Sequence, residues 1–220
     1  MADGGGGMAT DGAPQEDMTS QRPASLSHHF LFMRKFFKHR RKIASIWPSS
    51  RFMARACISQ VNFSQAKLVV ELGAGTGAIT QAVLASLNPR TRFISIERDA
   101  DFFQVLQERF AGGVGRQIEL LHGDVSHLTD LLRGCGVQDG SVDAFISGLG
   151  TPSLPPAARS GILTALQWAA KPECVFSNIT EIPLYYLPFY RRHFGSVRFE
   201  FVPLNIPPGG VYHCRHAIRV

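Results

Sequence analysis

Residues 69–80 read VVELGAGTGAIT, a short apolar run followed by three closely spaced glycines and the beginning of a helical pattern. Glycine permits a tight turn and allows a ligand to approach the backbone closely. We therefore interpret the stretch as a buried strand, a ligand-binding turn and the first helix of an α/β sheet. A plain strand–helix turn that binds no ligand is the alternative at this point.

The same alternation continues outward from this stretch. Further strands are expected at residues 92–96, 118–121, 142–147 and 174–179, with helices ending near residue 87 and at 101–110, 127–132 and 157–170. Strands that alternate with helices predict a parallel sheet with helices on both faces. Two final runs, 197–202 and 211–218, are joined by a Pro/Gly-rich segment without a helix, which predicts a closing antiparallel pair.

An acidic residue lies at or near the end of each of the first three expected strands. Glu71 precedes the glycine turn, Glu97 ends the second strand 24 residues after Gly73, and Asp124 follows the third. The glycine spacing also fits the dinucleotide pattern G-x-G-x-x-G/A, but Glu71 would repel a pyrophosphate. An ammonium group beside Glu71, ribose hydroxyls at Glu97 and an adenine amino group at Asp124 together indicate S-adenosylmethionine. Asp124 alone could equally be the cap of the next helix.

Composition excludes several classes of protein. The chain has 220 residues, 45% of them apolar and 18% charged, which suits one domain with a sizeable core. It has neither an uninterrupted apolar run long enough to cross a membrane nor a signal peptide, so we expect a cytoplasmic protein. Four scattered cysteines without a C-x-x-C pair predict reduced thiols, and no acid–histidine spacing fits a metal site, so we expect none.

The positive charge is concentrated near the N-terminus. Residues 1–25 hold one Arg against four acids (net −3), residues 26–55 hold eight Lys/Arg and no acid (net +8), and residues 56–220 hold fourteen against thirteen (net +1). We predict a disordered tail at 1–25, a basic amphipathic helical extension at 26–62, with its second helix near 51–61, and the main domain at 63–220.

The extension has an apolar and a cationic face when it is drawn as a helix. Such a helix suits the surface of an anionic membrane, which predicts peripheral association with the inner face of the membrane. Packing of the apolar stripe on the domain and binding of nucleic acid are the alternatives. The candidate membrane or substrate residues are Phe30, Met33, Arg34, Phe37, Lys38 and Arg41.

The chain resembles the class I S-adenosylmethionine-dependent methyltransferases between about residues 30 and 217. Within them it resembles the bacterial phospholipid N-methyltransferases, which are related to the rRNA adenine dimethyltransferases. The segments that carry the resemblance are WPSSR (47–51), VELGAGTG (70–77), IERD (96–99), HGD (122–124), SGL (147–149), SLP (153–155) and IPP (206–208). Residues 150–152, Gly-Thr-Pro, depart from the more apolar segment that the family tends to have there.

The resemblance implies a Rossmann-like, mostly parallel, seven-stranded sheet whose last strand is antiparallel. It also implies that S-adenosylmethionine donates methyl groups to the amine of a membrane lipid, with S-adenosylhomocysteine as the product. Phosphatidylethanolamine is the first expected acceptor and an aminolipid such as ornithine lipid the second. The candidate donor-binding residues are Glu71, Gly73, Ala74, Gly75, Gly77, Glu97, Arg98, Asp124, Val125 and Ser147.

The acceptor side is less defined by the sequence. Tyr185, Tyr186 and Tyr190 follow the fifth strand and are candidates for a headgroup pocket, because aromatic faces hold methylated cations. Packing of these rings against the sheet is the alternative. We assign no catalytic base. An rRNA adenine methyltransferase and a non-catalytic donor-binding tether remain alternatives, although Ser147–Gly150 stands where adenine methyltransferases carry Asn/Asp-x-Pro-Tyr/Phe.

Overall fold

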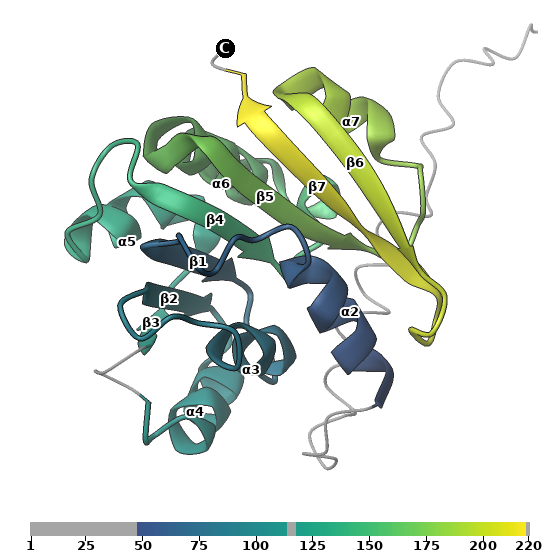
Figure 1. The fold of residues 1–220 in the computed structure, drawn as a ribbon. Coiled ribbons are helices and arrows are strands. Elements are labelled where there is room, and N and C mark those ends of the chain that lie inside the picture. The colour runs from purple at the N-terminus through teal and green to yellow at the C-terminus, as the bar shows by residue number, and fades with distance from the viewer. Residues whose placement is uncertain (1–47, 114–117, 219–220) are drawn as a thin grey trace, which may run out of the picture. The chain divides into compact units, whose positions relative to one another are not determined.

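The computed structural model describes residues 48–113 and 118–218. Strands and helices alternate as far as β5, and the last two strands follow one another without a helix (Figure 1). The elements are α2 Pro48–Ile58, β1 Leu68–Leu72, α3 Ala78–Leu84, β2 Arg92–Glu97, α4 Ala100–Arg109, β3 Ile118–His122, the 3₁₀ helix η2 Val125–His127, α5 Leu128–Gly134, β4 Val142–Ser147, the 3₁₀ helix η3 Thr151–Ser153, α6 Pro156–Ala169, β5 Ala170–Thr180, α7 Leu187–His193, β6 Phe194–Val202 and β7 Gly209–Ala217.

The strands form one seven-stranded sheet in the order β3-β2-β1-β4-β5-β7-β6. β1 to β5 pair in parallel, whereas β7 is antiparallel to both of its neighbours. The predicted Rossmann-like sheet with an antiparallel last strand is therefore confirmed. The chain order reverses beside β1, which has β2 on one side and β4 on the other. Such a reversal leaves a crevice at the carboxyl ends of the two central strands, where ligands bind in open α/β sheets.

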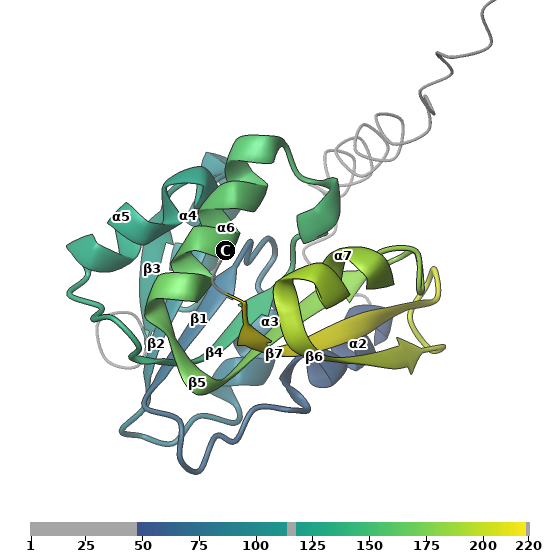
Figure 2. The same ribbon diagram turned by 90° about the horizontal axis from the view of Figure 1, so that it is seen from above.

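Helices cover both faces of the sheet (Figure 2). Side chains of α2 and α3 pack against one face, in a cluster that includes Met53, Cys57 and Val83. Side chains of α5, α6 and α7 pack against the other face, in a cluster that includes Leu132, Ile162 and Tyr190. The carboxyl edge of the sheet is therefore held between two packed layers.

Some predicted bounds differ from the structure. The helix expected near residues 51–61 is α2, and it begins at Pro48. The helix starts three residues earlier than expected because proline suits the first turn of a helix, where its missing N–H has no partner. β5 begins at Ala170, four residues before the expected start, because Ala170 pairs with Val142 across an irregularity in the register.

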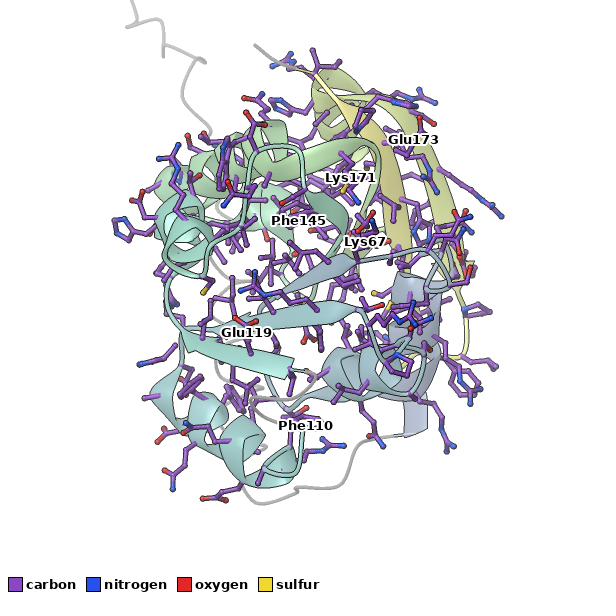
Figure 3. The ribbon with its side chains drawn as sticks, turned by 60° about the vertical axis from the view of Figure 1, so that its left-hand side comes forward. Lys67, Phe110, Glu119, Phe145, Lys171 and Glu173 are labelled. Atoms are coloured by element: carbon purple, nitrogen blue, oxygen red, sulfur yellow. The ribbon has the colours of Figure 1, made fainter. Side chains whose placement is uncertain are left out.

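The amino edge of the sheet is tied together by a single carboxylate. Asp143, in β4, accepts hydrogen bonds from the backbone N–H groups of Lys67 and Leu68 and pairs with the ammonium of Lys171 in β5. Figure 3 shows Lys67 and Lys171 close together at this edge. These bonds align the start of β1 with β4 and β5, so that the same strands also end side by side.

Candidate functional site

The three glycines of the turn after β1 have conformations that other residues rarely adopt. The backbone φ angles are +72° at Gly73, +55° at Gly75 and +83° at Gly77. The N–H of Gly73 donates to the carbonyl of Ile96 at 2.9 Å, which ties the turn to the end of β2. A Cβ atom built on Gly75 would meet nothing within 4 Å. The turn is therefore fixed to β2 by a hydrogen bond and has free space at Gly75, as a ligand-binding turn requires.

Glu71 lies fully buried beneath this turn. Its Oε2 accepts hydrogen bonds from the hydroxyls of Thr80 at 2.7 Å and Ser95 at 2.6 Å. Its Oε1 is buried without a hydrogen-bond partner. Burial raises the pKa of Glu71 to about 7, although the two hydroxyls act in the opposite direction. A buried carboxylate oxygen without a partner needs a group that donates a hydrogen bond to it. The ammonium of S-adenosylmethionine is such a group and has the opposite charge.

Glu97 organises the turn as well as facing it. Its Oε2 accepts a hydrogen bond from the N–H of Gly75 at 2.8 Å, which joins the end of β2 to the glycine turn. Its Oε1 accepts from the N–H groups of Arg98 at 2.9 Å and Asp99 at 2.8 Å. A carboxylate has about four acceptor directions, so Glu97 retains one. Three backbone hydrogen bonds already occupy most of these directions, and a contact of Glu97 with the ribose hydroxyls stays a prediction.

Asp124 both caps a helical turn and pairs with a cation. Its Oδ1 accepts a hydrogen bond from the N–H of Ser126 at 2.8 Å, and its Oδ2 lies 3.2 Å from Arg98 Nη1. The N–H of Ser126, followed by Arg98, holds the pKa of Asp124 below its usual range. Val125, the next residue, is buried. The cap that the sequence left as an alternative is therefore present, and a contact of Asp124 with adenine stays a prediction.

The end of β4 packs directly on the glycine turn. Gly148 donates to the carbonyl of Leu72 at 2.9 Å, and a Cβ atom on Gly148 would lie 2.6 Å from the carbonyl oxygen of Gly73. Ser147 is fully buried, and its hydroxyl accepts from the N–H of Leu149 at 3.2 Å. The two central strands thus meet with backbone against backbone, which explains why a glycine follows Ser147.

Buried polar groups that sequence reasoning missed lie beside Ser147. The register pairs Ser147 with Asn178 of β5, and the amide oxygen of Asn178 accepts a short hydrogen bond from the hydroxyl of Thr151. The Nδ2 group of Asn178 donates to the carbonyl of Ile179 at 2.7 Å. Only the β4–β5 register could have pointed to these residues, because 27 positions separate Thr151 from Asn178 in the chain.

The three tyrosines predicted on the acceptor side have different environments. Tyr185 is 59% exposed, Tyr186 is half-buried against the core, and Tyr190 is fully buried. The rings of Tyr190 and Tyr212 lie 4.4 Å apart between centroids, and both side chains are fully buried. Tyr190 thus packs in the core, as the alternative interpretation expected, and its hydroxyl also interacts with the side chain of Asn178.

The remaining sequence predictions fall outside this region. Phe30, Met33, Arg34, Phe37, Lys38 and Arg41 lie outside the described residues. Within residues 48–113 and 118–218, no three His, Cys, Asp or Glu side chains are grouped as a metal site would require. In the same part of the chain, no helix is both long and apolar enough to cross a bilayer. All four cysteines are free, and three of them are buried.

Known proteins resemble this chain in sequence and in fold. Residues 36–129 match the ribosomal RNA adenine dimethylase family. The ornithine lipid N-methyltransferase of Singulisphaera acidiphila is 41% identical over 186 residues, which cover 84% of this chain and 95% of that enzyme. Ribosomal RNA small subunit methyltransferase A of a Sulfurihydrogenibium species is 30% identical over 74 residues, 34% of this chain and 28% of that enzyme.

A solved structure has a similar fold. The 1,6-didemethyltoxoflavin-N1-methyltransferase of Burkholderia thailandensis, crystallised with S-adenosylhomocysteine, superposes with a TM-score of 0.60. The match covers 93% of this chain and 99% of that one at 15% identity. At so low an identity the likeness concerns the arrangement of strands and helices alone.

Proposed function

The chain belongs to the class I S-adenosylmethionine-dependent methyltransferases, in the family of the ornithine lipid N-methyltransferase, and we propose that it methylates the amine of an ornithine-type lipid. One observation carries this proposal: 41% identity extends over 95% of a relative with that activity. The similarity therefore includes the part of the sheet expected to bind the methyl acceptor as well as the part expected to bind the methyl donor. Phosphatidylethanolamine, the first acceptor expected from the sequence, becomes the second choice.

The residues at the carboxyl edge suit the methyl donor. S-adenosylmethionine supplies an electrophilic methyl group on a sulfonium and leaves as a thioether. The orphaned Oε1 of Glu71 would accept from the donor's ammonium, and the remaining acceptor direction of Glu97 would take one ribose hydroxyl. The loop at Asp124 and Val125 would flank the adenine. The open space at Gly75 would let the methyl donor approach the backbone of the turn there.

The acceptor amine must be neutral when its nitrogen attacks the methyl group. An alkyl ammonium with a pKa near 10.4 costs roughly 4–5 kcal/mol to deprotonate at pH 7. Burial favours the neutral amine, and the cationic donor disfavours a second positive charge close by. We infer that the headgroup is desolvated beside Asn178, next to the buried side chains of Tyr190 and Tyr212. Alignment and desolvation there supply the acceleration, since no general base is assigned.

Methylation of rRNA adenine is the second candidate because of the family match. That match ends at residue 129, before β4 begins at Val142, so it covers the donor half of the sheet and little of the acceptor half. The residues that end β4 are Ser-Gly-Leu-Gly, without the proline and aromatic residue that hold a flipped adenine. These features favour a lipid amine over a nucleobase.

The test offers three methyl acceptors to one enzyme. Methyl-labelled S-adenosylmethionine is incubated with the protein, vesicles that contain ornithine lipid, vesicles of phosphatidylethanolamine, and ribosomal RNA, each separately and in competition. We expect label in ornithine lipid at a rate at least tenfold above that in phosphatidylethanolamine, and background label in RNA. Label that enters RNA, with none in either lipid, would replace the proposal by its alternative.

A further inference from the structure

Exposed apolar side chains gather on two short segments of the structure. Seven large apolar side chains of the described residues stand out as exposed, and five of these lie either in the segment that follows β5 or in the last residues of β6 and the β6–β7 connection. The five, here called the apolar rim, are Leu184 (57% exposed), Tyr185 (59%), Phe201 (55%), Leu204 (62%) and Ile206 (67%). Single exposed apolar residues are normal on proteins, but such a concentration marks a contact surface.

The sheet brings these two segments to the same edge. β7 lies between β5 and β6, and the register pairs Thr180 with Gly210 and Val202 with Gly209. The chain therefore leaves β5 and β6 at neighbouring points of the carboxyl edge, and a Cβ atom on Gly209 would lie 3.6 Å from Cα of Glu181. Figure 1 shows the β6–β7 connection extending beyond the sheet near the end of β5. This is the edge that carries the donor and acceptor groups.

The local backbone holds the rim outward. Leu184 has a φ of +64°, a left-handed conformation that costs a leucine roughly 1 kcal/mol. Asn205 stabilises the β6–β7 connection with two hydrogen bonds. Its N–H donates to the carbonyl of Val202 at 3.3 Å, and its Nδ2 donates to the carbonyl of Pro207 at 2.7 Å. Leu204 and Ile206 flank Asn205, so a braced turn presents both side chains.

Positive charge accompanies the rim. Exposed Arg55 of α2 lines a groove of about 350 Å³ together with Phe52, Phe201 and Leu204. Towards its N-terminus α2 approaches the carboxyl edge, because a Cβ atom on Gly209 would lie 3.0 Å from Met53 Cε. The sequence that precedes Pro48 contains six Lys/Arg between residues 34 and 42. Two acids lie nearby: Glu200 lines the same groove and accepts from Ser59 at 2.8 Å, and Glu181 has an interaction partner.

We propose that the apolar rim inserts into the boundary between headgroups and acyl chains of an anionic bilayer, and so places the carboxyl edge of the sheet against its lipid substrate. The proposal rests on the proposed function, because a lipid amine stays at the membrane surface and the enzyme must bring its edge there. Apolar side chains inserted to this depth, next to cations, are the usual composition of interfacial membrane-binding surfaces. The rim acts in addition to whatever residues 26–47 contribute.

The test compares two double variants of the full chain. Leu204→Ser with Ile206→Ser removes the two most exposed side chains of the rim, and Val105→Ser with Ile218→Ser removes exposed apolar side chains elsewhere (40% and 41% exposed). Binding is measured by flotation with vesicles of phosphatidylcholine and 30–40% phosphatidylglycerol. The rim variant should partition at least tenfold more weakly, a difference of about 1.4 kcal/mol, and the control should match the wild type.

Two further readouts keep the result interpretable. Methylation of a short-chain, water-soluble aminolipid should be the same in the rim variant and the wild type, whereas methylation of vesicle lipid should fall with binding. Equal vesicle binding by all three proteins would overturn the proposal, as would light scattering that shows the rim to be covered by a second copy of the chain. Rim-dependent binding without methylation of any lipid amine would instead refute the proposed function alone.

Discussion

Glu71 is a buried carboxylate whose charge depends on pH in the physiological range. Burial raises its pKa to about 7 in the free protein, and a cation at its orphaned Oε1 would favour the ionised form. We predict that affinity for S-adenosylhomocysteine falls as the pH is lowered from 7 to 5.5, by up to about tenfold per pH unit. Calorimetry of the wild type and Glu71→Gln measures this: the variant should bind more weakly and without the pH dependence.

The same residue affects the stability of the free protein with a defined sign. Its pKa is about 7 in the fold against 4.5 in the unfolded chain, so the stability that it contributes below pH 4.5 is lost as the pH rises through 7. Urea denaturation of Glu71→Gln should show a smaller loss of unfolding free energy over this range. Identical pH profiles for the wild type and the variant, in both binding and unfolding, would show that the charge of Glu71 affects neither binding nor stability.

The acids at the strand ends could be predicted from the sequence, but their partners could not. Strand-end positions of Glu71 and Glu97 follow from the alternation of apolar runs and turns. The bond between Glu97 and the N–H of Gly75 joins residues 22 positions apart and exists only because β1 and β2 are in register. The sequence pointed to a ribose contact for Glu97, but it could not show that three backbone N–H groups already donate to this carboxylate.

At the scale of elements, α6 determines the position of the loop at Asp124. A Cβ atom on Gly161, in α6, would lie 2.4 Å from the carbonyl oxygen of Val125 and 2.7 Å from that of Ser126. Neither oxygen can move without displacing η2. We predict that Gly161→Ala destabilises the protein by about 1–3 kcal/mol and weakens donor binding at least tenfold. Denaturation and calorimetry measure the two effects.

Gly134→Ala is the matched control for this prediction. Gly134 ends α5, and a Cβ atom there would meet nothing within 4 Å. Because alanine loses less conformational entropy than glycine on folding, the control should be neutral or more stable by up to about 1 kcal/mol. Unchanged donor affinity in Gly161→Ala would show that the contact between α6 and η2 does not position the loop.

The bounds of the strands and helices follow the sequence pattern only in part. β4 has the predicted ends, because its mostly apolar residues stand between turn residues. β5 extends back over Lys171, Pro172 and Glu173, which do not resemble a strand but are carried into the sheet by its neighbours. The helix predicted to end near residue 87 is α3, which ends at Leu84, and the next residues continue as hydrogen-bonded turns onto the carbonyl of Val83.

At the scale of the whole molecule, donor binding and membrane binding are assigned to different parts of the chain. Every candidate residue for binding the methyl donor lies between Glu71 and Ser147, whereas six of the eight Lys/Arg in residues 26–55 precede Pro48. We predict that deletion of residues 1–47 leaves affinity for S-adenosylhomocysteine within twofold of the wild type. Binding to anionic vesicles at 0.1 M salt should weaken at least tenfold, because each basic residue near such a surface contributes up to about 1 kcal/mol.

The residual binding of this truncated protein tests the division further. If the apolar rim inserts as proposed, Leu204→Ser with Ile206→Ser should reduce the remaining vesicle affinity again. Salt should have little effect on that remaining part, because insertion of apolar groups is not screened. A truncated protein that binds vesicles as tightly as the full chain would exclude residues 26–47 as a membrane element.

Tandem mass spectrometry of the product shows directly whether this methyltransferase modifies the amine of a membrane lipid. The full-length protein is incubated with S-adenosylmethionine and vesicles that contain ornithine lipid, and the lipid is fragmented. We expect one or more added methyl groups on the headgroup amine, and none when either the enzyme or S-adenosylmethionine is left out. Lipid that remains unmodified, or methyl groups found only outside the headgroup amine, would contradict it.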